Sequence, residues 1–276
     1  QSDSVPCLNM TTQRDALVKQ LTAANVGDVF IDEDAIQRAS HDTSLFELKP
    51  RAIVAPRDTA DVERLVRFAT THHGVSLTAR AAGTDMSGGP LTESIVVSFT
   101  EHFTGIDGVS HSRATVQPGV YYRDFERATM KTGWLLPSYP ASRELCTVGG
   151  MVANNSGGEK TLAYGQTADY VESLKVVLAD GGEHELRTLS HPQLMAKKKL
   201  RTFEGRLYRT IDAILTKNAV AIGLAKPKVS KNAAGYALWN VRNEKDKTFD
   251  LSQLIVGSQG TLGLISQITF RLIKPK

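Results

Sequence analysis

Hydrophobic residues in the first hundred positions follow two different periods. The segment 51–56, RAIVAP, is short and apolar, which predicts a buried strand. The segments 75–79, VSLTA, and 94–99, SIVVSF, predict two more strands. Between the first two strands, residues 58–74 have a helical period that is carried by Val62, Leu65, Val66 and Ala69.

Capping residues mark the ends of this predicted helix. Asp58 or Thr59 can cap its start, and Gly74 can end it. A helix that connects two strands of one sheet implies that the strands are parallel. The loop at 80–90 would therefore lie at the carboxyl end of a parallel strand, where open α/β sheets bind ligands.

The pattern changes after Phe99, and the elements expected there are strands at 114–120 and 262–272, a helix at 121–133 and a hairpin at 170–186. The hairpin should turn at Asp180–Gly182. In the last strand, one side is expected to carry Ile268, Phe270 and Leu272.

The segment between the hairpin and the last strand is more polar. We expect a solvated connection up to about Arg206, which would include the basic run KKKLR at 197–201. A helix is then predicted over 207–220, and one of its faces would carry Leu207, Ile211, Ile214 and Leu215.

These elements predict an α+β fold with two lobes. The first lobe would be a small parallel β-α-β unit, and the second a larger mixed or antiparallel sheet with helices. We expect an N-terminal segment and helix at 1–39, the first lobe at 40–100 and the second lobe at 101–276.

Composition and charge narrow the function classes. The 276 residues are 41% hydrophobic and 22% charged, as in soluble globular proteins. A net charge of +4 favours a phosphate-bearing ligand, but without a basic helix interleaved with aromatic residues no nucleic-acid partner is expected. Cys7 and Cys146 belong to no metal-binding cluster, so we expect no metal site and a reducing, cytoplasmic compartment.

The loop at 80–90, RAAGTDMSGGP, raises the question of a nucleotide site. Gly83 and Gly88 have the spacing of a P-loop, but Gly89 and Pro90 stand where that motif needs Lys and then Ser or Thr. The loop also lacks the G-x-G-x-x-G pattern of a Rossmann site. A non-helical nest of backbone N–H groups that binds an anion remains, beside the alternative of a tight surface loop.

Two more glycine-dense segments follow far along the chain. In 147–165, Thr147 can cap a short helix that ends at Asn154 and Asn155, and free N–H groups at its start would favour an anion. In 256–265, VGSQGTLGLI, glycines recur every third residue. Glycines at such places also serve turns alone, but three segments together suit an elongated ligand between lobes.

The sequence resembles the FAD-linked oxidase family, whose FAD-binding domain has the PCMH or vanillyl-alcohol oxidase type of fold, and within it the D-lactate, glycolate and D-2-hydroxyglutarate dehydrogenases. The matching stretches are in family order from about residue 40 to 273, and they include TARAAGTDMSGG, TVGGMVANNSGG, YGQTADYVESLKVVLADG, KNAAGYAL and LIVGSQGTLGLISQITFRL. The resemblance implies an FAD cofactor.

The resemblance also implies which residues bind FAD. Backbone N–H groups of Ala81 to Asp85 would bind the pyrophosphate, and Ser87 could add a hydroxyl group. Thr147, Gly149 and Gly150 would approach the flavin end. The remaining residues expected to bind FAD are Arg80, Pro137, Ser142, Asn155, Ser156, Gly157, Gly158, Gly260, Thr261, Leu264 and Ile265.

Three positions differ from the family pattern. Thr84 stands where covalent members have the histidine that bonds the flavin, so we expect non-covalent FAD. Ala82 stands where many relatives have glycine, which costs little if its φ is negative. Tyr139 replaces a usual aspartate, so the contacts around it are open.

For such a family the expected reaction is hydride transfer from a 2-hydroxy acid to the flavin, with quinone, cytochrome or another flavoprotein as electron acceptor. The groups that orient the substrate come, in relatives, from a domain that we expect to be missing here, so no catalytic residue is assigned. Lys228, Lys231 and Tyr236 could reach the substrate side, but a solvated loop is equally open.

Two alternatives to this function stay open. One is a reductase of the same fold that acts on a UDP-sugar enol ether, and the other is a non-catalytic FAD-binding or electron-transfer subunit. Peripheral association of a longer parent protein with the inner membrane is a further expectation. The isolated chain is expected to be inactive by itself.

Overall fold

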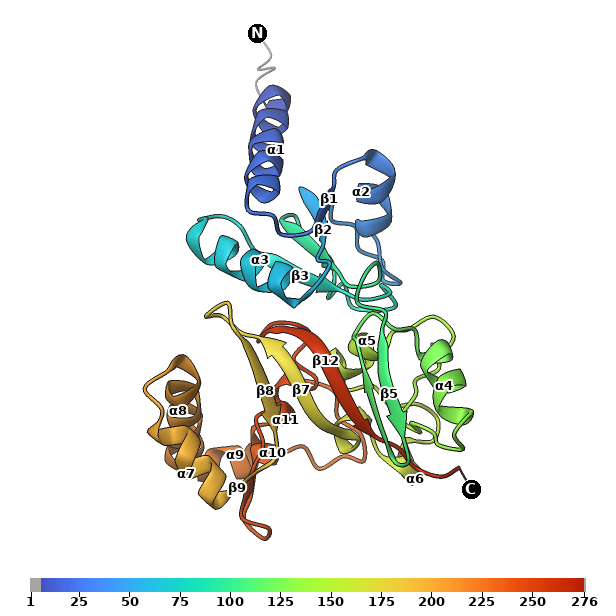
Figure 1. Ribbon diagram of the computed structural model, residues 1–276, viewed down its shortest axis with the longest axis vertical. Helices are drawn as coiled ribbons and strands as arrows, with labels where there is room; N and C mark the ends of the chain where they lie inside the picture. The colour runs from blue at the N-terminus through green and yellow to red at the C-terminus, as the bar shows by residue number, and fades with distance from the viewer. Residues whose placement is uncertain (1–5, 276) are drawn as a thin grey trace.

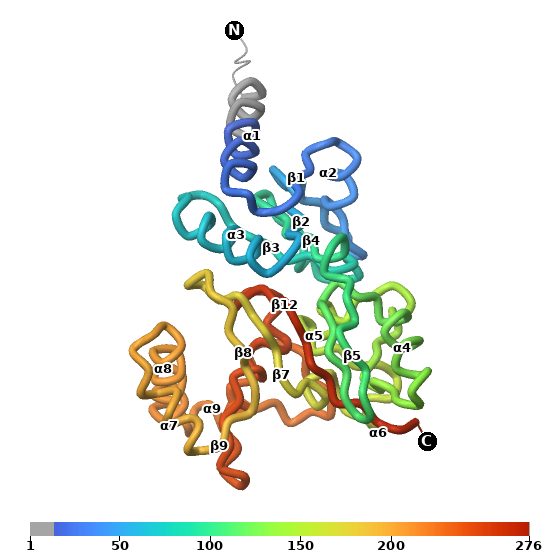
Figure 2. The backbone as a smooth tube through the Cα atoms, viewed as in Figure 1, coloured from blue at the N-terminus to red at the C-terminus, as the bar shows by residue number. Residues whose placement is uncertain are grey.

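The computed structural model describes residues 6–275, with side chains from residue 14 onward, and has two lobes joined end to end (Figure 1). The first described element is α1 (Pro6–Ala23). The first lobe extends to about residue 100, and the residues that follow form the second lobe (Figure 2). The predicted α+β fold with a small parallel and a larger antiparallel lobe is confirmed. The segment expected before the first helix lies largely outside the described residues.

The first lobe is built on a four-stranded sheet with the order β1-β2-β4-β3. The strands are β1 (Asp28–Phe30), β2 (Ala52–Ala55), β4 (Ile95–Ser98) and β3 (Leu77–Arg80). β2 and β3 both pair in parallel with β4, as predicted. The short β1 was not predicted; it pairs antiparallel with β2, so this sheet begins before residue 40.

The helix α3 (Thr59–Thr71) connects β2 to β3 and begins as its capping residue predicts. The Asp58 carboxylate accepts a hydrogen bond from the Asp61 N–H at 2.9 Å, and the chain turns at Gly74 with φ +78°. Val62 and Leu65 are fully buried against the sheet. A shorter helix, α2 (Glu33–Ala39), lies before β2.

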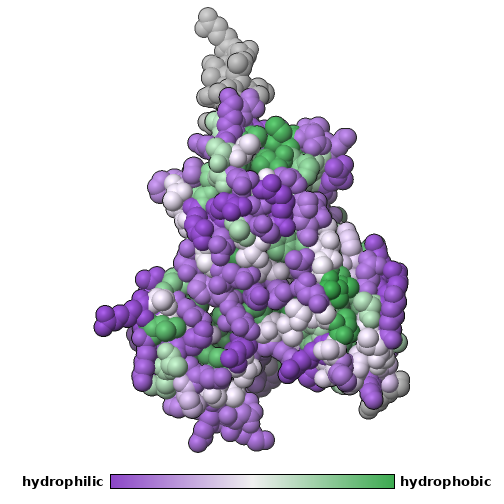
Figure 3. All heavy atoms as spheres, viewed as in Figure 1, coloured by the Kyte–Doolittle hydropathy of each residue, from purple (hydrophilic) through white to green (hydrophobic). Residues whose placement is uncertain are grey.

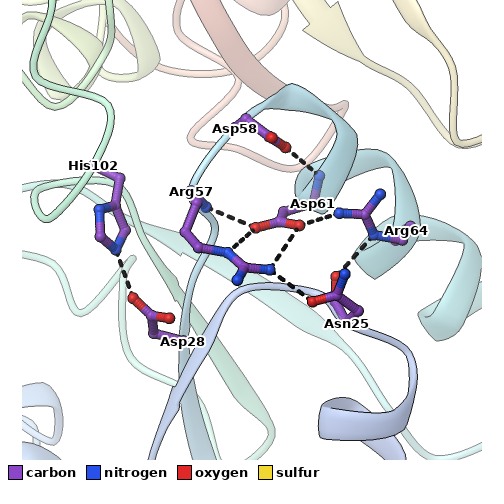
Figure 4. Close-up of polar contacts among 7 residues, drawn as sticks. All are labelled: Asn25, Asp28, Arg57, Asp58, Asp61, Arg64 and His102. Atoms are coloured by element: carbon purple, nitrogen blue, oxygen red, sulfur yellow. Dashed lines mark hydrogen bonds and ion pairs between the residues drawn. The ribbon is translucent and has the colours of Figure 1, made fainter.

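Asp61 is a buried carboxylate, 1% exposed, at the centre of a polar cluster (Figure 4). It accepts hydrogen bonds from the Arg57 side chain at 2.7 Å and from Arg64. Both arginines also contact Asn25, which follows α1. Burial alone would raise the pKa of Asp61, but these hydrogen bonds, those from Arg57 above all, hold it below its ordinary value. The cluster thus fixes the start of α3 to the chain that enters the sheet.

The second lobe is built on a five-stranded antiparallel sheet with the order β5-β6-β12-β7-β8. The strands are β5 (Ile106–Ser110), β6 (Arg113–Val116), β12 (Leu264–Arg271), β7 (Val171–Val177) and β8 (Glu183–Arg187). The predicted hairpin turn lies between β7 and β8. Ile268, Phe270 and Leu272 are buried on one side, which confirms the prediction for the last strand.

Several helices cover or flank this sheet. Among them are α4 (Tyr122–Met130), α5 (Val148–Ala153), α6 (Thr161–Tyr164), the 3₁₀ helix η1 (Thr167–Asp169) and α11 (Ser252–Ile255). A peripheral unit adds the elements β9 (Leu189–Ser190), α7 (His191–Lys199), α8 (Phe203–Lys217), α9 (Ala219–Ala225), α10 (Leu238–Val241), β10 (Arg242–Asn243) and β11 (Thr248–Phe249).

The prediction of a solvated connection up to Arg206 was wrong. α7 occupies part of it, and the basic run at 197–201 begins in the last turn of that helix. A capping box of Ser190 and Gln193 starts α7, and Leu194 is its buried residue, so hydrophobic periodicity alone missed it. α8 begins at Phe203, earlier than expected, and Ile214 on its predicted apolar face is 40% exposed.

The two lobes contact each other through α3 and the β7–β8 hairpin. Val177 and Leu264 of the second sheet are buried in the hydrophobic core of the first lobe. Arg67 of α3 donates a hydrogen bond to the Gly181 carbonyl at 2.6 Å, and Glu63 accepts one from the Glu183 N–H at 3.0 Å. This contact holds the lobes together beside the glycine-rich segments.

Candidate functional site

A cavity of about 720 Å³ lies where the three glycine-rich segments meet, with walls from both lobes. The first lobe contributes the loop 80–90, and the second contributes parts of 140–156 and 258–265. The structure thus brings together segments that are far apart in sequence. The predicted site residues that line the cavity are Arg80, Ala81, Gly83, Thr84, Asp85, Ser87, Ser142, Thr147, Gly149, Gly150, Ser156, Gly260 and Ile265.

The other predicted site residues are not part of the cavity lining; they are Ala82, Pro137, Asn155, Gly157, Gly158, Thr261 and Leu264. A Cβ atom on Gly158 would lie 2.2 Å from the Tyr139 carbonyl oxygen, and one on Gly157 would lie 2.6 Å from the Thr161 hydroxyl. Gly158 therefore allows the segment to pack closely on Tyr139, and Gly157 allows it to pack closely on itself. Ala82 has no positive φ, which meets the condition under which alanine costs little there.

The loop 80–90 follows β3 and provides free backbone donors. The N–H groups of residues 81–85 have no acceptor among the described residues. Gly83 and Gly88 have φ values of +69° and +82°, which give the loop its concave path. Four of these five residues line the cavity, so the loop has the character of an anion-binding nest.

The Asp85 carboxylate organises the other half of this loop. It accepts hydrogen bonds from the Ser87 N–H at 3.0 Å, the Ser87 hydroxyl at 2.8 Å and the Gly89 N–H at 2.8 Å. Burial would raise the pKa of Asp85, but these bonds, led by that from Gly89, hold it below its ordinary value. The Ser87 hydroxyl proton, expected to be free for a ligand, is therefore donated to Asp85.

The segment after α2 supports the same loop from outside. The Asp42 carboxylate accepts the Gly88 N–H at 3.0 Å, and the Thr43 N–H and hydroxyl donate to the Asp85 carbonyl at 3.0 and 2.6 Å. These bonds fix the loop on the carboxyl side of its free donors, and β3 holds the chain on their amino side. The loop is therefore preorganised before any ligand binds.

Arg80 ends β3 with its guanidinium group turned toward α2. It donates to the carbonyl oxygens of His41 at 2.6 Å and of Arg38 and Ala39 at 3.3 Å. Burial lowers its pKa, and Asp42 opposes that shift. Arg80 lines the cavity, but its guanidinium group donates to backbone carbonyls at the carboxyl end of α2.

The start of α5 corrects one expectation. Thr147 caps the helix, as predicted, by accepting the Gly150 N–H at 3.3 Å. The Val148 and Gly149 N–H groups donate to the carbonyl oxygens of Val120 and Pro118, each at 2.9 Å. The expected free N–H groups are therefore already bonded within the protein, and this helix start forms a wall of the cavity and no anion site.

The third glycine segment is attached to the end of α5. The Gly257 and Gln259 N–H groups donate to the Val152 and Ala153 carbonyl oxygens, each at 2.9 Å. A Cβ atom on Gly260 would lie 3.3 Å from the Ala79 Cβ, so the glycine lets this segment approach β3. The second and third segments and the first lobe therefore meet around one space.

The sequence analysis missed several lining residues, which include Thr43, Phe99, Pro118, Pro140, Ala141, Leu145, Cys146, Met151, Ser258 and Gln259. Five of these ten, Leu145, Cys146, Met151, Ser258 and Gln259, lie inside or next to the segments that the glycines marked. These five residues could have been found from their position beside the glycines, but their residue types gave no indication that they line a cavity. Burial raises the pKa of the Cys146 thiol to about 11, so the thiol is protonated at neutral pH.

The segment 228–236 passes outside the cavity. The Lys231 ammonium group donates to the Gly157 carbonyl at 2.8 Å, and the Tyr236 hydroxyl lies 2.8 Å from the Thr261 hydroxyl. These residues and Lys228 do not line the cavity. Tyr139 packs against Tyr122 and lies under Arg143, which gives the unusual tyrosine a packing role.

Comparison with known proteins identifies the type of domain. The family described as "FAD binding domain" matches residues 50–187, half of the chain. D-2-hydroxyglutarate dehydrogenase from Escherichia coli is 30% identical over 83% of this chain and 23% of its own length. The glycolate oxidase subunit GlcD from Bacillus subtilis is 32% identical over 85% of this chain and 39% of its own length.

A third relative and a solved structure agree with these matches. D-lactate dehydrogenase from Archaeoglobus fulgidus is 30% identical over 80% of this chain and 38% of its own length. An alkyldihydroxyacetonephosphate synthase has the same fold, with a TM-score of 0.60 at 21% identity over 89% of this chain and 38% of that one. The chain thus spans less than half the length of each of these proteins.

Proposed function

The chain belongs to the FAD binding domain family, FAD is its cofactor, and we propose that it forms the cofactor-binding part of an oxidoreductase that oxidises a 2-hydroxy acid. The observation that carries the proposal is the row of free N–H groups at residues 81–85 beside the cavity. The relatives named for D-2-hydroxyglutarate, glycolate and D-lactate support the substrate class, since all three are 2-hydroxy acids.

The residues present fit FAD. Its pyrophosphate carries negative charge, and the N–H groups of residues 81–85 are donors that lack partners among the residues that the structure describes. Its flat ring system needs an apolar surface, which Phe99, Pro118, Met151 and Ile265 provide. We therefore place the pyrophosphate at the first loop and the rest of the cofactor along the second and third segments.

When bound, FAD accepts the hydride that leaves the α-carbon of a hydroxy acid. The residues of this chain bind and position the cofactor, and the apolar lining excludes water from it. Three ionisable side chains line the cavity. Asp85 is held ionised by its donors, Arg80 is bonded to α2, and Cys146 stays protonated, so we assign none of them to take the substrate hydroxyl proton.

The activity, its substrate and a quinone, cytochrome or flavoprotein acceptor are proposed for the whole protein of which these residues are the FAD-binding part. Turnover is measured with that protein and D-2-hydroxyglutarate, D-lactate or glycolate, by reduction of a dye acceptor. Oxidation of at least one of the three is expected. Activity with none of them, in a protein that holds FAD, would contradict the substrate class and leave FAD binding intact.

FAD binding is tested on this chain by titration with fluorescence detection. We expect saturable binding of FAD, and binding at least about 100-fold weaker for riboflavin, because riboflavin lacks the phosphates that the first loop would bind. Equal affinity for the two would place the main contacts elsewhere. Absence of any FAD binding would contradict the proposal for the chain itself.

Thr84 lines the cavity and has no nucleophile that bonds a flavin methyl group, which supports non-covalent binding. After precipitation of the FAD-loaded protein with acid, we expect all of the flavin in the supernatant. Yellow colour that stays in the washed precipitate would show a covalent bond.

A further inference from the structure

A long connection, residues 226–237, joins α9 to α10, and we call it the strap. It leaves the end of α9 and crosses the second lobe toward α6 (Figure 2). The face of this lobe seen in Figure 3 is largely hydrophilic, and no helix in the described part of the chain is long and apolar enough to cross a membrane. No residue of the strap is buried, and the N–H groups of residues 227–237 donate to no backbone carbonyl among the described residues. The strap is therefore held in place by polar contacts of side chains.

Three amide side chains and backbone groups join the middle of the strap to the second glycine segment. Gln166, at the start of η1, bridges the two, because its Oε1 accepts the Asn232 N–H at 3.0 Å and its Nε2 donates to the Asn155 carbonyl at 2.8 Å. The Asn155 side chain donates to the Asn232 carbonyl at 3.4 Å. Asn155 has φ +47°, a left-handed conformation that asparagine adopts more readily than most residues. The strap thus contacts the second segment where the chain turns away from α5.

Two further side chains attach the strap on either side of this contact. The Lys231 ammonium group donates to the Gly157 carbonyl at 2.8 Å. The Thr261 hydroxyl donates to the Ser258 carbonyl at 2.6 Å, so in its 2.8 Å contact with Tyr236 the tyrosine hydroxyl is the donor. The strap is therefore bonded to both the second and the third glycine segments.

Each residue that the strap holds lies next in the chain to residues that line the cavity. Asn154 and Ser156 line it on either side of Asn155, and Gly260 lines it directly before Thr261. The strap itself does not line the cavity. It supports the wall of the cavity from behind, through contacts that are few and solvent-exposed. Segments held in this way open locally at little cost in free energy.

We propose that the strap holds the second and third glycine segments in the arrangement that fits FAD, with Lys231 and Tyr236 as positioning residues, and that it closes when FAD binds and opens when FAD leaves. This inference rests on the proposed function, since it takes FAD as the occupant of the cavity. Linkage then requires that FAD favours the closed strap by the same factor by which the closed strap raises FAD affinity.

Limited proteolysis with trypsin measures the opening of the strap, because the protease cleaves locally unfolded chain. Lys228 and Lys231 are cleavage sites within the strap, and Lys199 and Arg201, near the turn between α7 and α8, are reference sites that do not line the cavity. We expect saturating FAD to slow cleavage in the strap about fivefold or more and to leave cleavage at the reference sites unchanged. Mass spectrometry identifies the fragments. No slowing in the strap, or equal slowing at all four sites, would overturn the proposal.

A pair of matched variants tests the positioning residues. Lys231→Met with Tyr236→Phe removes both side-chain donors and keeps the approximate shape of the side chains. We expect FAD to bind about fivefold more weakly, because two exposed hydrogen bonds contribute modestly, and FAD to protect the strap less by the same factor. The control is Lys228→Met with Tyr164→Phe, which makes the same chemical changes at side chains that have no hydrogen bond within the described residues. The control should bind FAD as the unaltered chain does.

Fluorescence titration measures FAD affinity, and urea denaturation without FAD checks the fold of each variant. The two variants should be equally stable without FAD. Weaker FAD binding that comes with lower stability of the FAD-free protein would overturn the proposal and assign the contacts to the fold alone. Equal FAD affinity of the two variants would overturn the role of the strap and leave FAD binding intact, whereas absence of FAD binding by the unaltered chain would overturn both.

Discussion

In the first glycine loop, the N–H groups of residues 81–85 have no acceptor among the described residues, whereas at the start of α5 the N–H groups of residues 148–150 are all bonded within the protein. The two segments look alike in sequence and both line the cavity. Only the first has the donors that an anion needs. We infer that the first loop binds an anionic group of the ligand and that the second segment forms a wall of the cavity.

The glycines of the two segments differ in the same way. Gly83 has a positive φ, so its conformation is what the loop requires. Gly149 does not, but a Cβ atom there would lie 2.5 Å from the Pro118 Cβ and 2.6 Å from its carbonyl oxygen. Glycine in the second segment therefore allows packing of protein on protein. The comparison predicts that substitutions in the two segments affect different properties.

The largest effect is expected from Gly149→Ala. Pro118 is rigid and cannot move aside, so the added methyl group should destabilise the FAD-free protein by about 3 kcal/mol. Urea denaturation without FAD measures this loss. The control is Gly223→Ala in α9, where a Cβ atom would meet nothing within 4 Å and stability should not fall. A Gly149→Ala protein of normal stability with weak FAD binding would assign this glycine to the ligand.

The next effect is expected from Gly83→Ala in the first loop. The residue has φ +69°, and an added Cβ atom would lie 2.4 Å from the Arg80 guanidinium group. Relief of this strain should turn the free N–H groups away and weaken FAD binding about tenfold or more. Gly74→Ala, with φ +78° and open space around its Cβ, is the matched control: it should lose about 1 kcal/mol of stability but no FAD affinity. Equal FAD affinity of both variants would contradict the proposal that the N–H groups of this loop bind FAD.

Asp85→Asn tests what organises the first loop. The change removes a negative charge from a site for an anion, so charge alone predicts tighter FAD binding. Because the Asp85 carboxylate holds the Ser87 and Gly89 N–H groups, we expect binding about fivefold weaker instead. Asp180→Asn, at the β7–β8 turn outside the cavity, should leave FAD affinity unchanged.

The same residue predicts a pH dependence. The pKa of Asp85 is lowered from 3.8 in the folded protein, so its stabilisation is present above that value and is lost as the pH falls through the lower folded pKa. The unaltered protein should exceed Asp85→Asn in stability by about 1 kcal/mol at pH 7, and the difference should disappear as the pH falls through the lowered folded pKa of Asp85. Urea denaturation at several pH values measures it. A difference that persists at low pH would mean that the ionised carboxylate is not the cause.

Sequence predicted the strands of both sheets well where burial is strong, as in β2, β4 and β12. It failed at β1, which has three residues, and at α7, where only Leu194 is buried, because short or exposed elements carry no period. For the site, the glycines marked three segments that the structure brings together around one cavity. Which N–H groups are already hydrogen-bonded within the protein could not be predicted from sequence. At the start of α5 the acceptors are the carbonyl oxygens of Val120 and Pro118, which lie outside the segment and reach it only in the folded chain.

The smallest effect concerns Cys146, which comes directly before the α5 cap and lines the cavity. Its pKa of about 11 leaves about a thousandth of the thiol ionised at pH 8, so a small thiol reagent should react slowly, and faster as the pH rises. In a Cys7→Ser background, bound FAD should slow the reaction at Cys146 a few-fold further, because the second segment forms a wall of the occupied cavity. Mass spectrometry of the labelled protein over time measures both rates. Equal rates with and without saturating FAD would move the cofactor away from the second segment and confine its contacts to the first loop.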